Sequence, residues 1–247
     1  MTRSAFLPYL PLDTIKVFAD GVWIIDGPEI GMRYFGITLP FPTRTTIVRL
    51  PAGDLWVHSP TAWNDDLGRA VAGLGDVGHL IAPNTLHYWH LPDWQKRFPK
   101  ARSYGPPGLV EKARRPLSID ETLGEDAPAS WDNAFGQCLV SGSLLTEVDF
   151  FHRRSRTLIL TDLIENFEPS RVRSQLLRWT MKAFGAADPD GKAPIDMQLS
   201  FYGSRRQVRA AAERMIDWEP ERIVISHGRC YEAHAVAELR RAFRWVL

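Results

Sequence analysis

Four side chains of metal-binding type lie just beyond the ends of three apolar, strand-like segments: His87, His90, Asp162 and His227. Neutral imidazole and carboxylate are ligands that zinc, iron and manganese share. Because open sheets gather ligand-binding groups at strand ends that are neighbours in space, the four residues predict one site for a divalent metal. Asp162 is the expected catalytic residue, as a metal ligand or as the group that orients a bound water.

Each candidate also has an ordinary structural explanation. A His-x-x-His pair is common in proteins that bind no metal, and Asp162 would equally cap a following helix or turn. His227 stands before Gly228 and fits a turn as well. The metal site is therefore favoured by the coincidence of three strand ends rather than by any single residue.

The elements that would position these residues alternate between strands and helices. Apolar or β-branched runs predict strands over 22–25, 45–50, 55–58, 77–82, 101–104, 137–140, 147–151, 156–161 and 222–226. Helical spacing and start signals predict helices over 59–72, 92–98, 109–114, 168–184, 204–217 and 232–246. Residues 29–42 and 116–133 are expected to be loops. This alternation indicates one α/β domain over residues 1–247.

Residues 73–78 match the dinucleotide-binding pattern G-x-G-x-x-G letter for letter. A dinucleotide fingerprint must follow a strand and open a helix. This one follows a predicted helix and opens a predicted strand, so it indicates a helix end and a turn.

The composition of the 247 residues is that of an ordinary globular protein, with a formal net charge of +1. That balance predicts neither a nucleic-acid partner nor a membrane surface, and leaves a small-molecule substrate or ligand as the expected partner. No run of 18 apolar residues and no signal-peptide pattern is present. The two cysteines, Cys138 and Cys230, are far apart in the sequence. Together these features lead us to expect a reduced, cytoplasmic protein, with its oligomeric state left open.

Four segments together resemble the metallo-β-lactamase fold superfamily, and within it a branch described as a domain of unknown function (DUF4336). They are LWVHSP at 55–60, APNTLH at 82–87, RTLILTD at 156–162 and ISHG at 225–228. The resemblance runs from about Lys16 to the last helix. It implies an αββα sandwich with a metal site at one edge.

The superfamily's metal motif, His-x-His-x-Asp-His, falls on residues 85–90 with two departures. His87 and His90 match two of its histidines, but Thr85 replaces the first histidine and Trp89 replaces the aspartate. That aspartate supports the second metal and the attacking water in the family. Its replacement by a bulky, uncharged side chain argues against a dinuclear site.

The rest of the family's ligand set is matched in part. Asp162 corresponds to the carboxylate that bridges two metals, and His227 to the last histidine. The histidine expected on the strand pair before Asp162 has no clear match, and Glu147 is the nearest candidate.

A two-metal hydrolase needs about six to eight ligands, more than this chain offers. The sequence therefore predicts a hydrolase that uses one divalent ion to activate water, with Tyr88, Trp89 and Trp94 as walls of its pocket. The alternative is a non-catalytic protein that keeps the fold and binds a small molecule or a partner. A serine hydrolase is disfavoured because the nucleophile motif G-x-S-x-G is absent.

Overall fold

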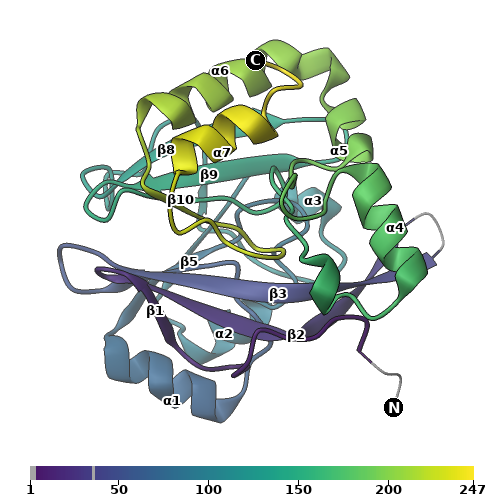
Figure 1. Ribbon diagram of the computed structural model, residues 1–247. Coiled ribbons are helices and arrows are strands. Elements are labelled where there is room, and N and C mark those ends of the chain that lie inside the picture. Colours follow the sequence, from purple (N-terminus) through teal and green to yellow (C-terminus); the bar gives the residue numbers. More distant parts are fainter. Residues whose placement is uncertain (1–3, 35–36) are drawn as a thin grey trace.

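The computed structural model describes residues 4–34 and 37–247, and two sheets lie face to face at its centre (Figure 1). The first sheet runs in the order β1 (Lys16–Ala19), β2 (Val22–Tyr34), β3 (Ile37–Arg49), β4 (Leu55–His58), β5 (Val77–Ile81), β6 (Arg102–Gly105) and β7 (Glu121–Thr122). The second sheet runs in the order β11 (Arg222–Val224), β10 (Thr157–Ile159), β9 (Thr146–His152) and β8 (Phe135–Ser141).

Helices cover the outer face of each sheet. The helices α1 (Asp65–Leu74) and α2 (Leu91–Arg97) lie on the first sheet, and α6 (Arg205–Asp217) and α7 (Ala235–Ala242) lie on the second (Figure 1). Connecting segments hold α3 (Leu109–Lys112), α4 (Gln175–Phe184), α5 (Ile195–Ser200) and the 3-10 turns η1 (Pro169–Arg171) and η2 (Tyr202–Ser204). This is the αββα sandwich that the sequence predicts. Among the described residues, no helix has the length and apolar character needed to cross a bilayer.

Three apolar layers hold the sandwich together. Between the sheets, Trp56 and Ile81 of the first sheet pack against Phe135 and Phe150 of the second. The outer layers join each sheet to its helices, and Trp94 of α2 belongs to the layer under the first sheet. Strands that are covered on both faces read as nearly continuous apolar runs, which is why β4, β5 and β10 are visible in the sequence.

The largest difference from the predicted elements is in the segment 29–42, expected to be a loop: residues 29–34 and 37–42 form strands, and residues 35–36 lie outside the described residues. The two strand segments extend β2 and β3 into a long antiparallel ribbon. Pro28 lies at a register shift between Gly27 and Ile30, where a proline does not interrupt the ladder of hydrogen bonds. The prolines and glycines that indicated a loop therefore bend the ribbon without ending it.

Two predicted helix starts and one predicted helix cap are also wrong. The helix α1 begins at Asp65, because the Asn64 side chain accepts a hydrogen bond from Leu67 N. The segment that follows Glu168 forms only the turn η1, and α4 begins after Ser174. Ser204 precedes α6 as predicted, but its side chain makes no capping hydrogen bond.

The placement of the G-x-G-x-x-G segment is as predicted. Gly75 follows the last turn of α1, and β5 opens at Val77. The segment therefore ends a helix and leads into a strand, the reverse of the order in a dinucleotide-binding unit.

Candidate metal centre

Three of the predicted ligands come together at one edge of the sandwich. The strands β10 and β11 are parallel neighbours, so the residues that follow them, Asp162 and His227, emerge at the same edge of the second sheet. His87 comes from the first sheet, in the loop between β5 and α2. The three side chains thus join the two sheets where their loops meet.

The donor atoms of these side chains converge on one point. His87 Nε2 lies 3.1 Å from His227 Nε2 and 3.4 Å from Asp162 Oδ1. His227 Nε2 lies 3.2 Å from the same Asp162 oxygen. The side chains of His87, Asp162 and His227 are only 9%, 5% and 3% exposed. Among the described residues, these three form the group whose spacing could hold a metal ion.

The spacing suits a small divalent ion. Metal–ligand bonds of about 2.0–2.2 Å in a tetrahedral site place neighbouring ligand atoms roughly 3.3–3.6 Å apart. The 3.1, 3.2 and 3.4 Å separations are close to that range. Two imidazoles and one carboxylate would leave a fourth position for water or substrate, and zinc, iron and manganese all accept this donor set.

Each imidazole is held through its other nitrogen. His227 Nδ1 donates to the Pro42 carbonyl at 3.0 Å, so its Nε2 carries the lone pair that faces the site. His87 Nδ1 lies 2.8 Å from the Ser59 hydroxyl, which can accept its proton. Histidines that bind metals usually donate their second N–H in this way, which fixes the tautomer and the orientation of the ring.

Asn84 positions two of the three ligands. Its Nδ2 donates to Asp162 Oδ2 at 2.8 Å, which leaves Oδ1 of that carboxylate facing the histidines. Its Oδ1 accepts from the backbone N–H groups of Leu86 and His87 at 2.8 and 2.7 Å, which shapes the loop that carries His87. The side chain is completely buried and uses both ends of its amide.

Glu147, the candidate fifth ligand, holds the backbone instead. Its carboxylate accepts hydrogen bonds from the N–H groups of Thr161, Asp162 and Leu163, and from Asn84 Nδ2. These bonds occupy both oxygens. Glu147 therefore fixes the turn in which Asp162 lies and is not among the groups that face the metal position.

His90, a predicted ligand, does not join the cluster. The chain turns after His87 and starts α2 at Leu91, and His90 is the residue that precedes this helix. Its backbone carbonyl accepts from Asp93 N within the first turn. The three-residue spacing that suggested a pair of ligands is therefore the spacing of a turn that leads into a helix.

The three aromatic residues predicted to line a pocket have other roles. Trp94 is fully buried under the first sheet and donates from Nε1 to the Thr61 carbonyl. Tyr88 is buried in the same cluster. Trp89 is 40% exposed and its ring faces the Arg115 guanidinium.

The aromatic side chains that do cover the site come from elsewhere. The rings of Phe41 and Phe167 lie 5.2 and 6.1 Å from the His227 ring, and Phe6 stacks on Phe167 at 5.3 Å. The sequence analysis did not identify these residues as part of the site. Phe41, for example, lies in the segment that was expected to be a loop. Asn84 had a detectable signal, since an asparagine after a strand often bonds to the backbone two residues further on.

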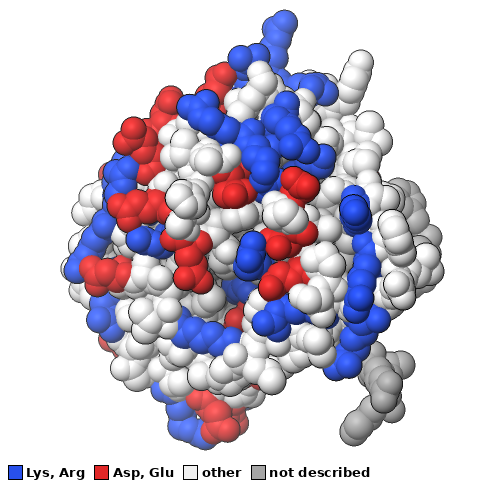
Figure 2. All heavy atoms as spheres, in the orientation of Figure 1, with Lys and Arg blue, Asp and Glu red and all other residues white. Residues whose placement is uncertain are grey.

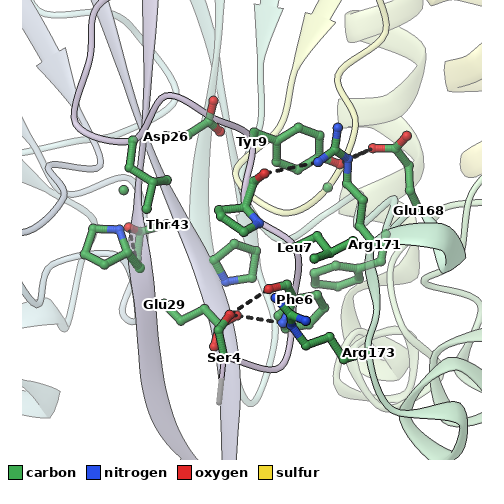
Figure 3. Close-up of a pocket in the computed structure, with 17 residues that line it drawn as sticks. Ser4, Phe6, Leu7, Tyr9, Asp26, Glu29, Thr43, Glu168, Arg171 and Arg173 are labelled. Atoms are coloured by element: carbon green, nitrogen blue, oxygen red, sulfur yellow. Dashed lines mark hydrogen bonds and ion pairs between the residues drawn. The ribbon is translucent and has the colours of Figure 1, made fainter. Parts of the chain in front are cut away.

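A cavity of about 390 Å³ lies beside the N-terminal segment (Figure 3). Pro42, whose carbonyl accepts the hydrogen bond from His227 Nδ1, is one of the residues that line it. The N-terminal segment forms one wall, held by hydrogen bonds from Ala5 N and Phe6 N to the Glu29 carboxylate. The Arg171 guanidinium lies over the Tyr9 ring in the same wall. Pro42, Phe167 and Gly228 also line this cavity, and none of the three ligands does.

Burial and the charges of neighbouring groups shift the pKa values of the three ligands in different directions. Burial raises the pKa of Asp162, but the charge of His87 and the close contacts with both imidazole rings outweigh it and hold the pKa well below its usual value. Burial lowers the pKa of His87, yet Asp162 reverses this and raises it. For His227 burial prevails and the pKa is lowered. A neutral His227 beside an ionised Asp162 is the protonation state that metal binding requires.

A family model described as a domain of unknown function (DUF4336) matches residues 20–188 of the chain. The comparison with curated proteins gives no match. The chain is similar in structure to the metallo-β-lactamase DIM-1 exposed to ceftazidime, with a TM-score of 0.62 at 11% identity over 95% of this chain and 97% of that one.

Two further solved structures show the same likeness. The metallo-β-lactamase FIM-1 from Pseudomonas aeruginosa, in its mono-zinc form, has a TM-score of 0.57 at 15% identity over 95% of this chain and 96% of that one. The metal-soaked flavodiiron core of Flv1 from Synechocystis sp. PCC6803 has a TM-score of 0.59 at 13% identity over 94% of this chain and 60% of that one. At these identities the likeness establishes the fold: the chain has the metallo-β-lactamase fold.

Proposed function

The chain belongs to the DUF4336 family, and we propose that it is a hydrolase that binds one divalent metal ion through His87, Asp162 and His227. The observation that carries the proposal is the convergence of these three donor atoms, each held by a second hydrogen bond. A bound zinc, iron or manganese ion would lower the pKa of a water molecule towards about 7 and polarise a substrate oxygen.

Asp162 and Asn84 would have different roles in the proposed reaction. Asp162 Oδ1 faces both histidines, so it would serve as a metal ligand or would orient the nucleophilic water by accepting a hydrogen bond from it. Asn84 holds the other carboxylate oxygen and prevents rotation of the group. The burial of all three ligands strengthens their electrostatic interactions, because little water screens them.

One metal is favoured over two by the roles of the surrounding residues. The Glu147 carboxylate accepts hydrogen bonds from backbone N–H groups, and His90 lies outside the cluster of three ligands. Thr85 and Trp89 stand where the superfamily motif has a histidine and an aspartate. The mono-zinc form of FIM-1 is a solved structure with this fold, so one zinc is compatible with the architecture.

Ser59, His87 and Asp162 also have the residue types of a serine hydrolase triad, with Ser59 Oγ 2.8 Å from His87. Two features argue against that reading. The residue after Ser59 is Pro60, which has no N–H group to stabilise an oxyanion. Ser59 itself is 5% exposed. A role in orienting the His87 ring is therefore the better assignment for Ser59.

The second candidate function is a non-catalytic one, and the enclosure of the site is what favours it. All three ligand side chains are less than a tenth exposed, and phenylalanine rings cover His227. Structural metal sites are closed, whereas catalytic sites keep a position open to substrate. In this case the ion would stabilise the junction of the two sheets.

Turnover by the metal-loaded protein separates the two functions. We would load the protein with zinc, iron or manganese and assay chromogenic carboxylic esters, phosphodiesters and a β-lactam, beside the variant Asp162→Asn. A hydrolase predicts turnover that needs the metal and falls at least about 100-fold in the variant. Metal that raises the melting temperature without turnover of any substrate class would favour the structural role.

A further inference from the structure

The helix α4 lies at the edge of the fold and carries two strongly exposed apolar side chains. Leu176 and Trp179 are 77% and 65% exposed, and none of the residues of α4 is fully buried. Ala183 follows at the spacing i, i+3, i+7, so the three share one face of the helix. Exposure of a leucine and a tryptophan side chain to water is unfavourable in free energy, so this face is suited to binding a partner that would bury it.

The other face of α4 is anchored to the protein. Leu177 and Met181 pack against the cluster formed by Phe6, Phe167, Val172 and Ala186. The outer apolar face is therefore not a core face left open by poor packing. Leu7, a half-exposed side chain, lies near α4, since it lines a groove together with Arg173 and Arg178.

The same part of the chain is strongly basic. Residues 170–185 contain Arg171, Arg173, Arg178 and Lys182 and no aspartate or glutamate, although the whole chain has a net charge of only +1. Figure 2 shows Lys and Arg side chains in a strip over the region of α4. Arg171 is paired with Glu168, and the other three are exposed, two of them within α4.

We propose that α4, with Leu7 beside it, is a surface that binds an anionic lipid bilayer. Leu176 and Trp179 would enter the boundary between headgroups and acyl chains, and the cations would contact lipid phosphates, as amphipathic helices do at membrane interfaces. Tryptophan is favoured at this depth because its ring is apolar and its N–H is polar. The surface is independent of the metal centre, and the protein would lie on the bilayer without crossing it.

The charges disfavour the other occupants. A second copy that packed α4 against α4 would bring Arg178 and Lys182 close to their equivalents, with no acidic residue in either helix. A nucleic acid would use the cations but would leave Leu176 and Trp179 without a favourable environment. An anionic bilayer offers both negative charge and apolar depth.

Flotation with lipid vesicles tests the proposal. The full chain is mixed with neutral phosphatidylcholine vesicles, or with vesicles in which roughly a third of the lipid is anionic phosphatidylglycerol. Two double variants are compared: Arg173→Gln with Lys182→Gln, and Leu176→Ser with Trp179→Ser. Arg178 is kept because its Nε donates to the Val172 carbonyl. The matched controls are Lys100→Gln with Lys112→Gln and Val17→Ser with Val110→Ser, all at exposed positions.

Binding to the anionic vesicles is expected, with affinity lowered by about fivefold for each charge removed from the surface and by at least about tenfold in the apolar variant. The controls should bind like the wild type, and circular dichroism should show all variants folded. Absence of vesicle binding, or equal loss in the controls, overturns the proposal. Binding to heparin but not to vesicles would also overturn it, and would point to a soluble polyanion or an acidic protein.

Discussion

Asn84 Nδ2 donates to Asp162 Oδ2 at 2.8 Å, and this contact links the loop after β5 to the end of β10. The two residues come from different sheets, 78 positions apart in the sequence. The same amide group accepts from His87 N, so one buried side chain sets the relative positions of two ligands. The candidate metal centre therefore depends on a residue that does not face it.

Replacement of Asn84 by leucine should weaken both folding and metal binding. Asn84→Leu removes one hydrogen bond each from Asp162 and Glu147 and leaves the backbone N–H groups of Leu86 and His87 without this acceptor, which should cost about 2–4 kcal/mol in the free energy of unfolding. Metal affinity should fall about 10- to 100-fold. Urea denaturation and metal titration measure the two effects. Gln137→Leu is the control: this buried amide bonds to the Gly124 and Asp126 carbonyls, so its loss should affect stability alone.

Ser59 combines a hydrogen bond to His87 with a left-handed backbone, at φ 52°. Ser59→Ala and Ser59→Gly both remove the hydroxyl, so each should lower metal affinity about 10- to 100-fold. Glycine adopts this conformation without the steric cost of a Cβ, and Ser59→Gly should be more stable than Ser59→Ala by about 1 kcal/mol. Unchanged metal affinity in both variants would show that the hydroxyl does not orient the imidazole.

Glu147 and Asp162 are adjacent buried carboxylates with different expected roles. Glu147→Gln weakens the bonds to three backbone N–H groups, and it should cost about 1–3 kcal/mol of stability while metal stoichiometry is kept. Asp162→Asn removes a charged ligand and should abolish metal binding. Calorimetric unfolding with parallel metal analysis distinguishes them. If Glu147→Gln lost its metal while its stability stayed unchanged, Glu147 would be a metal ligand, and the role assigned to it here would be wrong.

How far the sequence predicts the site depends on which part of the chain carries each residue. Asp162 and His227 directly follow buried strands, whose apolar runs are easy to recognise, and parallel pairing brings them together. His90 was expected from its spacing after His87 and from its match to the superfamily's metal motif, and that spacing is equally the geometry of a turn into α2.

The supporting residues were not predictable because they act across the fold. The Pro42 carbonyl binds His227 over 185 positions, and no local pattern marks a carbonyl group for this role. The residue type of Glu147 suggests a metal ligand. Only the structure shows that its carboxylate oxygens accept hydrogen bonds from the backbone N–H groups of residues 161–163. The sequence therefore indicates residue types at strand ends, while the hydrogen bonds between sheets require the structure.

His58 makes the stability of the fold sensitive to acid. Both of its ring nitrogens are buried without a hydrogen-bond partner, and burial, followed by the charge of His87, lowers its pKa to about 3 from 6.5. The unfolded chain therefore takes up a proton that the folded chain excludes, and stability is lost as the pH falls from 6.5 towards 3. The loss from this residue between pH 7 and pH 4.5 should be roughly 2–3 kcal/mol.

The variant His58→Phe tests this dependence, because it keeps a ring against Trp56 and Phe150. Urea denaturation at pH 7 and pH 4.5 should show a smaller loss of stability in His58→Phe than in the wild type. His234→Asn, at an exposed position, should follow the wild type. An identical acid sensitivity in His58→Phe and the wild type would assign the effect to other groups.

The metal content of tag-free protein, measured by plasma mass spectrometry after loading with zinc, iron or manganese, tests the central claim most directly. The wild type should hold about one equivalent of metal, His227→Ala should hold none, and His90→Ala should match the wild type, because His90 lies outside the cluster. No bound metal in the wild type, or retention in His227→Ala, would contradict a metal centre built from His87, Asp162 and His227.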